Sequence, residues 1–249
     1  MGVLYKKVER DLIKPGDHIY SWRSAYIYAH HGIYAGDGKV IHFTRGAGQG
    51  IGTGTALDKF IFSSSPSHNP DNPCPDCGDQ SRPDGVFCSW LDCFLAGGDL
   101  YLFEYDVKVA YFLAKARGGT CTLAKSDPPE DVLHRASVLL KNGLGMYHIF
   151  KNNCEDFAIF CKTGLLVNTD NFSVGRSGQA ASLLALATTV MSPRLRFLTT
   201  SGLAVVGNFG GLAVVGAGMY CVSRLASDMG VRRDVVKVPV ETLVLCFGT

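Results

Sequence analysis

The sequence lacks a strong excess of either charge, and this limits the partners we expect. Its 249 residues include 24 Lys and Arg and 22 Asp and Glu, for a net charge of +2. A chain this close to neutral carries no basic footprint for nucleic acid, so we expect no nucleic-acid partner. The length suffices for one domain with a sizeable core, with or without an appendage.

Several short signals are missing as well. The start, MGVLYKKVERDLIKPGD, has no apolar signal core, and Lys6 stands where a myristoylation signal has Ser or Thr. The glycine-rich stretch 46–56 has no lysine followed by Ser or Thr, which argues against a phosphate-binding P-loop. The nine cysteines are an odd number, which argues against a disulfide framework. The odd cysteine count and the missing signal core together indicate a reducing, intracellular setting.

The stretch NNCEDFAIFCKTG, residues 152–164, predicts a helix that begins on a cysteine. Cys154, Phe157, Ala158 and Cys161 recur with the helical period. An asparagine before the cysteine can cap the helix, two acids fill the first turn, and a glycine follows the last turn. A helix N-terminus favours a thiolate. A buried, inert cysteine is the alternative interpretation.

A thiolate nucleophile needs a base, so the seven histidines are informative. Three of them, His30, His31 and His42, lie close together on two strands that are predicted to pair. A three-residue turn, 36–38, would place His30 on the face of His42, whereas a two-residue turn, 37–38, would place His31 there. The pattern alone leaves both registers open.

A cysteine at a helix start and two histidines on a hairpin form the composition of a thiol acyl-transfer site. One imidazole would take the thiol proton and later return it to a leaving group. The other would hold the first in the correct tautomer. The backbone N–H of Cys154 could stabilise an oxyanion.

The remaining chain predicts a mixture of helices and strands. Residues 129–142 read as an amphipathic helix that begins with a proline and ends before a glycine. Residues 98–112 have alternating strand character, and the tail 234–247 predicts a terminal strand.

Two motifs resemble the lecithin retinol acyltransferase family, which includes small phospholipase A/acyltransferases. HHGIYAGDGKVIHF resembles the family's histidine segment, in which a second His follows the first after a hairpin turn. His30 and His42 have the family's separation, whereas His31 and His42 do not. NCEDF resembles the family's NCEHF box around its nucleophile, with Asp156 in place of the box histidine. The layout looks most like the plant members, the Lead-sensitive group.

The resemblance covers roughly residues 10–165 and implies an α+β, circularly permuted papain-like fold. It implies His30 as the base, His42 as the orienting partner and Cys154 as the nucleophile, with no cofactor for catalysis. It also favours the three-residue register of the hairpin. A lipid or phospholipid ester is the substrate class that it implies.

Relative to the small animal members of the family, residues 66–98 form a cysteine-rich insertion. Its four thiols contain a CxxC pair and fit a tetrahedral structural zinc site; they are Cys74, Cys77, Cys88 and Cys93. Zinc would staple a loop that is too polar to fold by burial. Four unrelated thiols, two of them in an apolar stretch, are the alternative.

Residues 197–223 form a run of 27 residues without a charge, between a linker at 166–196 and a tail at 224–249. GLAVVG occurs twice in it, nine residues apart, so a helix here is apolar on both sides. At ~1.5 Å per residue the run reaches about 40 Å, more than a bilayer core. It predicts a C-terminal membrane segment, with a buried helix pair as the alternative. Gly207 and Gly211 form a GxxxG motif that suits a homo-oligomer.

Taken together, the sequence predicts an intracellular, membrane-associated thiol acyltransferase or phospholipase that acts on lipid esters through a Cys154 acyl-thioester. A papain-like thiol peptidase or isopeptidase is one alternative. A non-enzymatic membrane scaffold with a vestigial triad is another.

Overall fold

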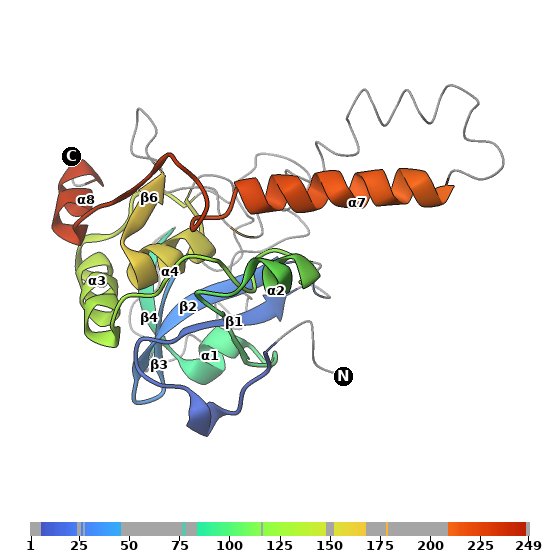
Figure 1. The fold of residues 1–249 in the computed structure, drawn as a ribbon. Coiled ribbons are helices and arrows are strands. Elements are labelled where there is room, and N and C mark those ends of the chain that lie inside the picture. The colour runs from blue at the N-terminus through green and yellow to red at the C-terminus, as the bar shows by residue number, and fades with distance from the viewer. Residues whose placement is uncertain are drawn as a thin grey trace.

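The computed structural model describes residues 6–23, 26, 28–45, 77, 84–115, 117–147, 152–167, 178 and 209–247 (Figure 1). The strands are β1 (His18–Arg23), β2 (Tyr28–Gly36), β3 (Lys39–Arg45), β4 (Asp84–Trp90), β5 (Tyr101–Leu102), β6 (Leu165–Val167) and β7 (Val235–Lys237). The helices are η1 (Arg10–Leu12), α1 (Leu91–Leu95), α2 (Val109–Ala114), α3 (Pro129–Asn142), α4 (Cys154–Thr163), α7 (Phe209–Ala226) and α8 (Val240–Phe247).

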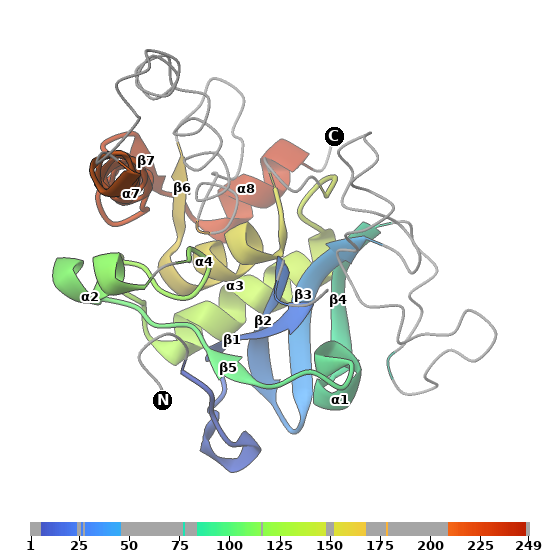
Figure 2. The same ribbon diagram turned by 90° about the vertical axis from the view of Figure 1, so that its right-hand side faces the viewer.

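A five-stranded antiparallel sheet lies at the centre, with strand order β4-β3-β2-β1-β5 (Figure 2). β6 and β7 form a second, two-stranded antiparallel sheet. The expected mixed α/β architecture with an antiparallel sheet is therefore confirmed. β4 lies within the predicted insertion 66–98, yet it pairs with β3 along its whole length.

Helices cover the two faces of the central sheet. On one face, Ile33 and Ile41 share a core cluster with Phe157 of α4 and with residues of α3. On the opposite face, Val40 packs with Phe94 of α1. This division follows the strand period, because Val40 and Ile41 are neighbours in β3 and therefore point to opposite sides.

The two predicted helices are confirmed, together with their caps. The side chain of Asn153 accepts hydrogen bonds from the N–H groups of Glu155 and Asp156, and Asp156 completes a capping box at the start of α4. Gly164 ends α4 with φ of 68°, the left-handed conformation that glycine adopts at little cost. Helix α3 covers the expected residues 129–142.

Two strand predictions were largely wrong. Of residues 98–112, only the short β5 is a strand, and 109–114 form α2. The tail contains the short β7 and then helix α8. Short apolar runs do not distinguish a strand from a helix. In α8, Val240 and Leu243 lie three residues apart and are buried together, whereas Leu245 is 76% exposed.

The chain after residue 223 packs against the rest of the molecule. β7 pairs with β6, which directly follows α4, and Lys237 forms an ion pair of 2.7 Å with Asp127. Asp228 accepts hydrogen bonds from the Thr122 hydroxyl and the Leu123 N–H, both at 3.1 Å. These contacts tie the C-terminal segment to the residues around α4.

Helix α7 contains the second half of the uncharged run and extends away from the body of the molecule (Figure 1). Residues 197–208 lie outside the described residues. Within the described part of the chain, no helix has the length and apolar character that crossing a membrane requires. The predicted C-terminal membrane segment is therefore not supported.

Candidate active site: a thiol at the fork of two histidine-bearing strands

The hairpin between β2 and β3 combines features of both expected registers. Gly36 pairs with Lys39, so the turn itself is the two-residue one, and its Asp37 and Gly38 both have positive φ, as a type I′ turn requires. A bulge between Tyr34 and Gly36 then shifts the register by one residue. The bulge returns His30 to the face of His42, as the three-residue register would have done.

The two imidazoles contact each other directly. His30 Nε2 lies 2.9 Å from His42 Nδ1, and the rings meet edge to face at 87°. His42 Nε2 in turn lies 2.9 Å from the Ser89 hydroxyl, which β4 contributes. All three side chains are buried. A continuous hydrogen-bonded chain therefore joins β2, β3 and β4.

Helix α1 covers this chain of polar groups. The ring of Phe94 lies 5.2 Å from that of His30 and 5.5 Å from that of His42, centroid to centroid. Gly32 permits this approach, because a Cβ on it would stand 3.0 Å from the Phe94 ring and 2.7 Å from Val40. The Arg23 guanidinium donates to the carbonyls of Phe94 and Leu95 and thereby holds the end of α1.

Cys154 is the first residue of α4, and its thiol is fully buried. The sulfur lies 2.8 Å from the Tyr28 hydroxyl and 4.0 Å from the Tyr147 hydroxyl, and these two hydroxyls lie 2.6 Å apart. The thiol also donates to the carbonyl of Ala29, at 3.8 Å. The nucleophile predicted from the sequence thus lies against the backbone residue that precedes His30.

This position is a fork in the sheet. Cross-strand pairs join β2 to β3 from Ile33 to Gly36, and among the described residues no such pair involves the earlier part of β2. The thiol lies beside that earlier part, near the Ala29 carbonyl and the His31 backbone N–H. Cys154, at the N-terminus of α4, therefore lies where the two histidine-bearing strands stop pairing.

Burial dominates the protonation of the thiol. It raises the pKa of Cys154 to about 11, and the hydrogen bond from Tyr28 acts in the opposite direction by stabilising the thiolate. The pKa of Tyr28 is itself raised well above its usual value by burial and by the neighbouring thiol. At neutral pH the resting site therefore holds a protonated thiol capped by tyrosine hydroxyls.

The imidazoles are held in the neutral form. Burial lowers the pKa of His42 to about 3, and the nearby charge of Arg23 contributes to the shift. Burial also lowers the pKa of His30 well below its usual range, with contributions from His42, Arg23 and His31. A neutral imidazole can accept a proton, which is the state that a general base requires.

The structure brings His30 and His42 together but does not bond them to the thiol. Among the described residues, no hydrogen bond joins Cys154 to either imidazole. The imidazoles point to the face of α1, whereas Cys154 belongs to the core on the face of α4. The roles of the three residues stay a prediction, since catalytic hydrogen bonds often form only in the complex with substrate.

A second pair of histidines lies on the α4 face of the sheet. His31 Nδ1 lies 2.9 Å from His18 Nε2, and His18 Nδ1 lies 2.7 Å from the Tyr105 hydroxyl. His18 also stacks on Phe103, with the ring centroids 4.2 Å apart. Both imidazoles are buried, and their contact joins β1 to β2 on the same face of the sheet as α4.

The predicted zinc ligands are only partly described. Cys74 lies outside the described residues. Cys77 is buried, and its sulfur accepts a hydrogen bond of 3.4 Å from the N–H of Trp90, at the junction of β4 and α1. Among the described residues, no group of three His, Cys, Asp or Glu side chains is arranged to hold a metal ion. The zinc site stays a prediction.

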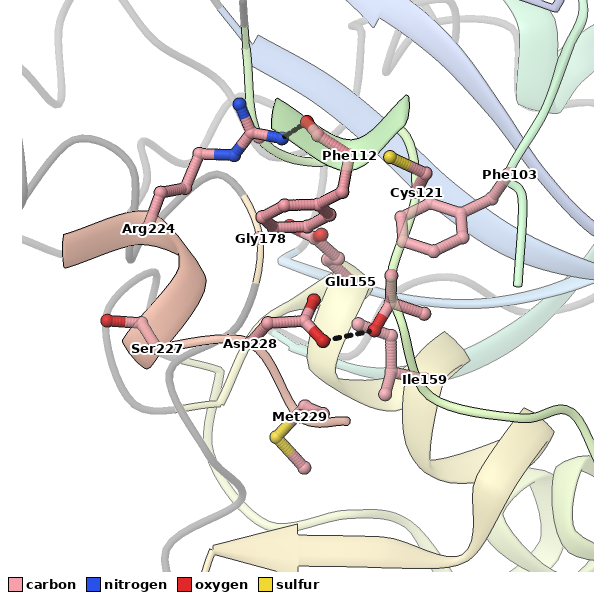
Figure 3. Close-up of a pocket in the computed structure, with 12 residues that line it drawn as sticks. Phe103, Phe112, Cys121, Glu155, Ile159, Gly178, Arg224, Ser227, Asp228 and Met229 are labelled. Atoms are coloured by element: carbon pink, nitrogen blue, oxygen red, sulfur yellow. Dashed lines mark hydrogen bonds between the residues drawn. The ribbon is translucent and has the colours of Figure 1, made fainter. Parts of the chain in front are cut away.

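A small cavity separates α4 from the C-terminal segment (Figure 3). Glu155, Arg224 and Asp228 line it together with the ring of Phe112, and Cys154 does not. The Arg224 guanidinium lies over that ring at 4.2 Å and donates to the Phe112 carbonyl. Residues of the C-terminal segment and of the helix that carries Cys154 therefore face each other across this cavity.

Comparison with known proteins assigns the chain to a family. The family model described as lecithin retinol acyltransferase matches residues 11–167. The chain belongs to the lecithin retinol acyltransferase family. It is also 56% identical over 244 residues to Protein LEAD-SENSITIVE 1 of Arabidopsis thaliana, an alignment that covers 98% of this chain and 90% of that protein. The resemblance seen in the two sequence motifs is therefore confirmed.

Sequence patterns do not identify three residues that contact the predicted site residues. Ser89 lies in a stretch that was interpreted only for its cysteines, and Tyr28 lies just before the histidine motif. Tyr147, seven residues before Cys154, completes the tyrosine pair. The only sequence signal for Tyr28 was its place two residues before His30, which puts both on one face of a strand.

Proposed function

We propose that this member of the lecithin retinol acyltransferase family is a thiol acyltransferase or phospholipase that acts on lipid esters through an acyl-thioester on Cys154. The observation that carries the proposal is the position of the sulfur. It lies at the N-terminus of α4 and at the fork between the strands that hold His30 and His42. Family membership supports acyl-transfer chemistry at this thiol.

In the proposed reaction, His30 takes the thiol proton as the sulfur attacks the ester carbonyl. The backbone N–H of Cys154 at the start of α4 and the Tyr28 hydroxyl are the donors proposed for the oxyanion, because the capping box already engages the N–H groups of Glu155 and Asp156. The tetrahedral intermediate expels an alcohol or lysolipid, which takes the proton from the imidazolium. Water, an amine or an alcohol then attacks the thioester and frees the thiol.

The resting site must open before this reaction. The thiol is fully buried and has a raised pKa, so a substrate has to displace the tyrosine cap and bring sulfur and imidazole together. Lipid binding can supply this change if the open form binds substrate more tightly than the closed form. We place the reaction at an intracellular membrane surface, because the proposed substrate is a lipid ester and the run 197–223 carries no charge.

The experiment is intact-protein mass measurement after incubation with mixed phospholipid vesicles. We expect an acyl mass increment on the full-length protein that is absent from Cys154→Ser. Cys161→Ala is the matched control, since Cys161 is another buried cysteine of the same helix. An increment that persists in Cys154→Ser, or that needs Cys161 instead, would reject Cys154 as the nucleophile.

One observation favours a second candidate function. The buried, protonated thiol without a bonded imidazole is also what a non-enzymatic scaffold with a vestigial triad would retain. Such a protein would show no acyl increment with any phospholipid. Its Cys154 would also react with alkylating agents no faster in the presence of vesicles than in their absence.

A further inference from the structure

The hydrogen-bonded chain of Ser89, His42 and His30 differs at its two ends in whether the terminal imidazole nitrogen has a partner. At one end, His42 Nε2 lies 2.9 Å from the Ser89 hydroxyl. At the other end, His30 Nδ1 is buried and has no hydrogen-bond partner among the described residues. Between these ends, His42 Nδ1 and His30 Nε2 lie 2.9 Å apart, so one of the two nitrogens carries the proton of this hydrogen bond. The partner at the first end therefore affects which nitrogen is protonated at the second.

Two proton arrangements satisfy the chain. In one, His42 Nε2–H donates to Ser89, His30 Nε2–H donates to His42 Nδ1, and His30 Nδ1 presents a lone pair. In the other, Ser89 donates to His42, His42 Nδ1–H donates to His30, and His30 Nδ1 carries an N–H. Each neutral imidazole has one donor and one acceptor nitrogen, so no mixed arrangement keeps both hydrogen bonds.

Only the first arrangement leaves a base at the free end. A buried N–H without an acceptor also loses the hydrogen bond that it would make with water, which disfavours the second arrangement further. Arg23 and His31 are the other charged or titratable groups that act on His30, and both disfavour its protonated form, as does His42. They leave the neutral ring in place. Ser89 then favours the first arrangement, because its hydroxyl accepts from the His42 Nε2–H that would otherwise be buried without a partner.

We propose that Ser89 is a positioning residue that sets the reactive tautomer of His30 through His42. This inference rests on the proposed function, in which His30 is the base. Ser89 accepts the hydrogen bond of His42 Nε2–H, and the lone pair of His30 Nδ1 is the result. The register of β4 makes this contact, because Ser89 pairs with Val40 and so shares its face with His42. A one-residue slip would turn the hydroxyl to the other face.

The test combines imidazole NMR with acylation kinetics on the full-length protein. In the wild type, nitrogen chemical shifts should show His30 and His42 protonated at Nε2. Ser89→Ala should mix the two tautomers and slow acyl-thioester formation roughly 2- to 10-fold, the factor that one neutral hydrogen bond supplies. Ser89→Thr keeps a hydroxyl and should restore both readouts.

Ser21→Ala is the matched control. Ser21 lies directly opposite His30 in β1 and is equally buried, and within the described part of the chain its hydroxyl has no hydrogen-bond partner. It should change neither readout. A wild-type His30 that is protonated at Nδ1, or a Ser89→Ala spectrum with unchanged tautomers, would overturn the proposal. A wild type with the expected tautomers but no acyl-thioester would instead reject the proposed function and leave the role of Ser89 in the tautomer standing.

Discussion

The Tyr28 hydroxyl lies 2.8 Å from the sulfur of Cys154 and 2.6 Å from the hydroxyl of Tyr147. This contact joins the start of β2 to the start of α4 across a fully buried interface. Of the contacts that lower the thiol pKa, it has the largest effect, and it thereby opposes the effect of burial.

Removing this hydroxyl should make the thiol less reactive. In Tyr28→Phe the thiolate loses a hydrogen bond from a neutral donor, and a bond to a charged acceptor is stronger than a neutral one. We expect alkylation of Cys154 by iodoacetamide to slow on the order of 10-fold at pH 7 to 9. Tyr105→Phe is a control, since Tyr105 bonds His18 rather than the thiol. Faster alkylation of Tyr28→Phe would show that the hydroxyl shields the sulfur instead.

His31→Ala should chiefly reduce stability. In the structure, the substitution leaves His18 Nε2 buried without its partner. An unsatisfied buried group costs about 1 to 3 kcal/mol, which urea denaturation would measure as a lower midpoint. Acylation by the folded fraction should be retained. A variant with wild-type stability and no acylation would identify His31, rather than His30, as the base.

Acid should destabilise the fold in a defined pH range. Burial lowers the pKa of both His31 and His42 to about 3 in the folded state, whereas the unfolded imidazoles keep their usual value near 6.5. Between these values the unfolded chain binds more protons. Stability is therefore fully present above about pH 6.5 and falls as the pH drops toward 3, by up to about 1.4 kcal/mol per pH unit for each histidine.

Denaturant titrations at several pH values would measure this slope. A stability that stays constant from pH 7 to pH 5 would contradict the buried, neutral state of the two imidazoles.

The C-terminal helix should contribute to the stability of the whole domain. Leu243 of α8 is fully buried in the core that contains Cys154 and α3. Leu243→Ala should lower the free energy of unfolding by about 2 to 5 kcal/mol. Leu245→Ala is the matched control, since Leu245 is 76% exposed on the same helix. Equal effects of the two variants would mean that α8 does not dock in solution.

The zinc prediction has a direct measurement. If Cys74, Cys77, Cys88 and Cys93 form one site, purified protein should carry about one zinc per chain by elemental analysis. Cys88→Ser should release it, whereas Cys121→Ser, which alters a buried cysteine outside the cluster, should not. Purified protein that contains no zinc, and whose stability does not change when a chelator is added, would contradict the predicted zinc site.

The sequence by itself determined the parts of this protein that depend on local signals. The asparagine cap, the helical period and the terminal glycine defined α4 and placed Cys154 at its start. The two motifs identified the family because their residues and order can be read without a fold. The alternation of apolar and polar residues was less informative. It predicted strands where α2 and α8 form, because short apolar runs occur in both strands and helices.

Only the tertiary structure decided which side chains meet. The bulge near Ala35 placed His30 rather than His31 beside His42, and a one-residue shift of register would have reversed this. Ser89 and Tyr28 reach the site through pairings across 47 and 126 residues of sequence, for which no local pattern exists. The docking of α8 depends on the complementary surface of α3, which exists only once both helices have formed. Contacts between distant segments follow from packing and register, and these are properties of the folded chain as a whole.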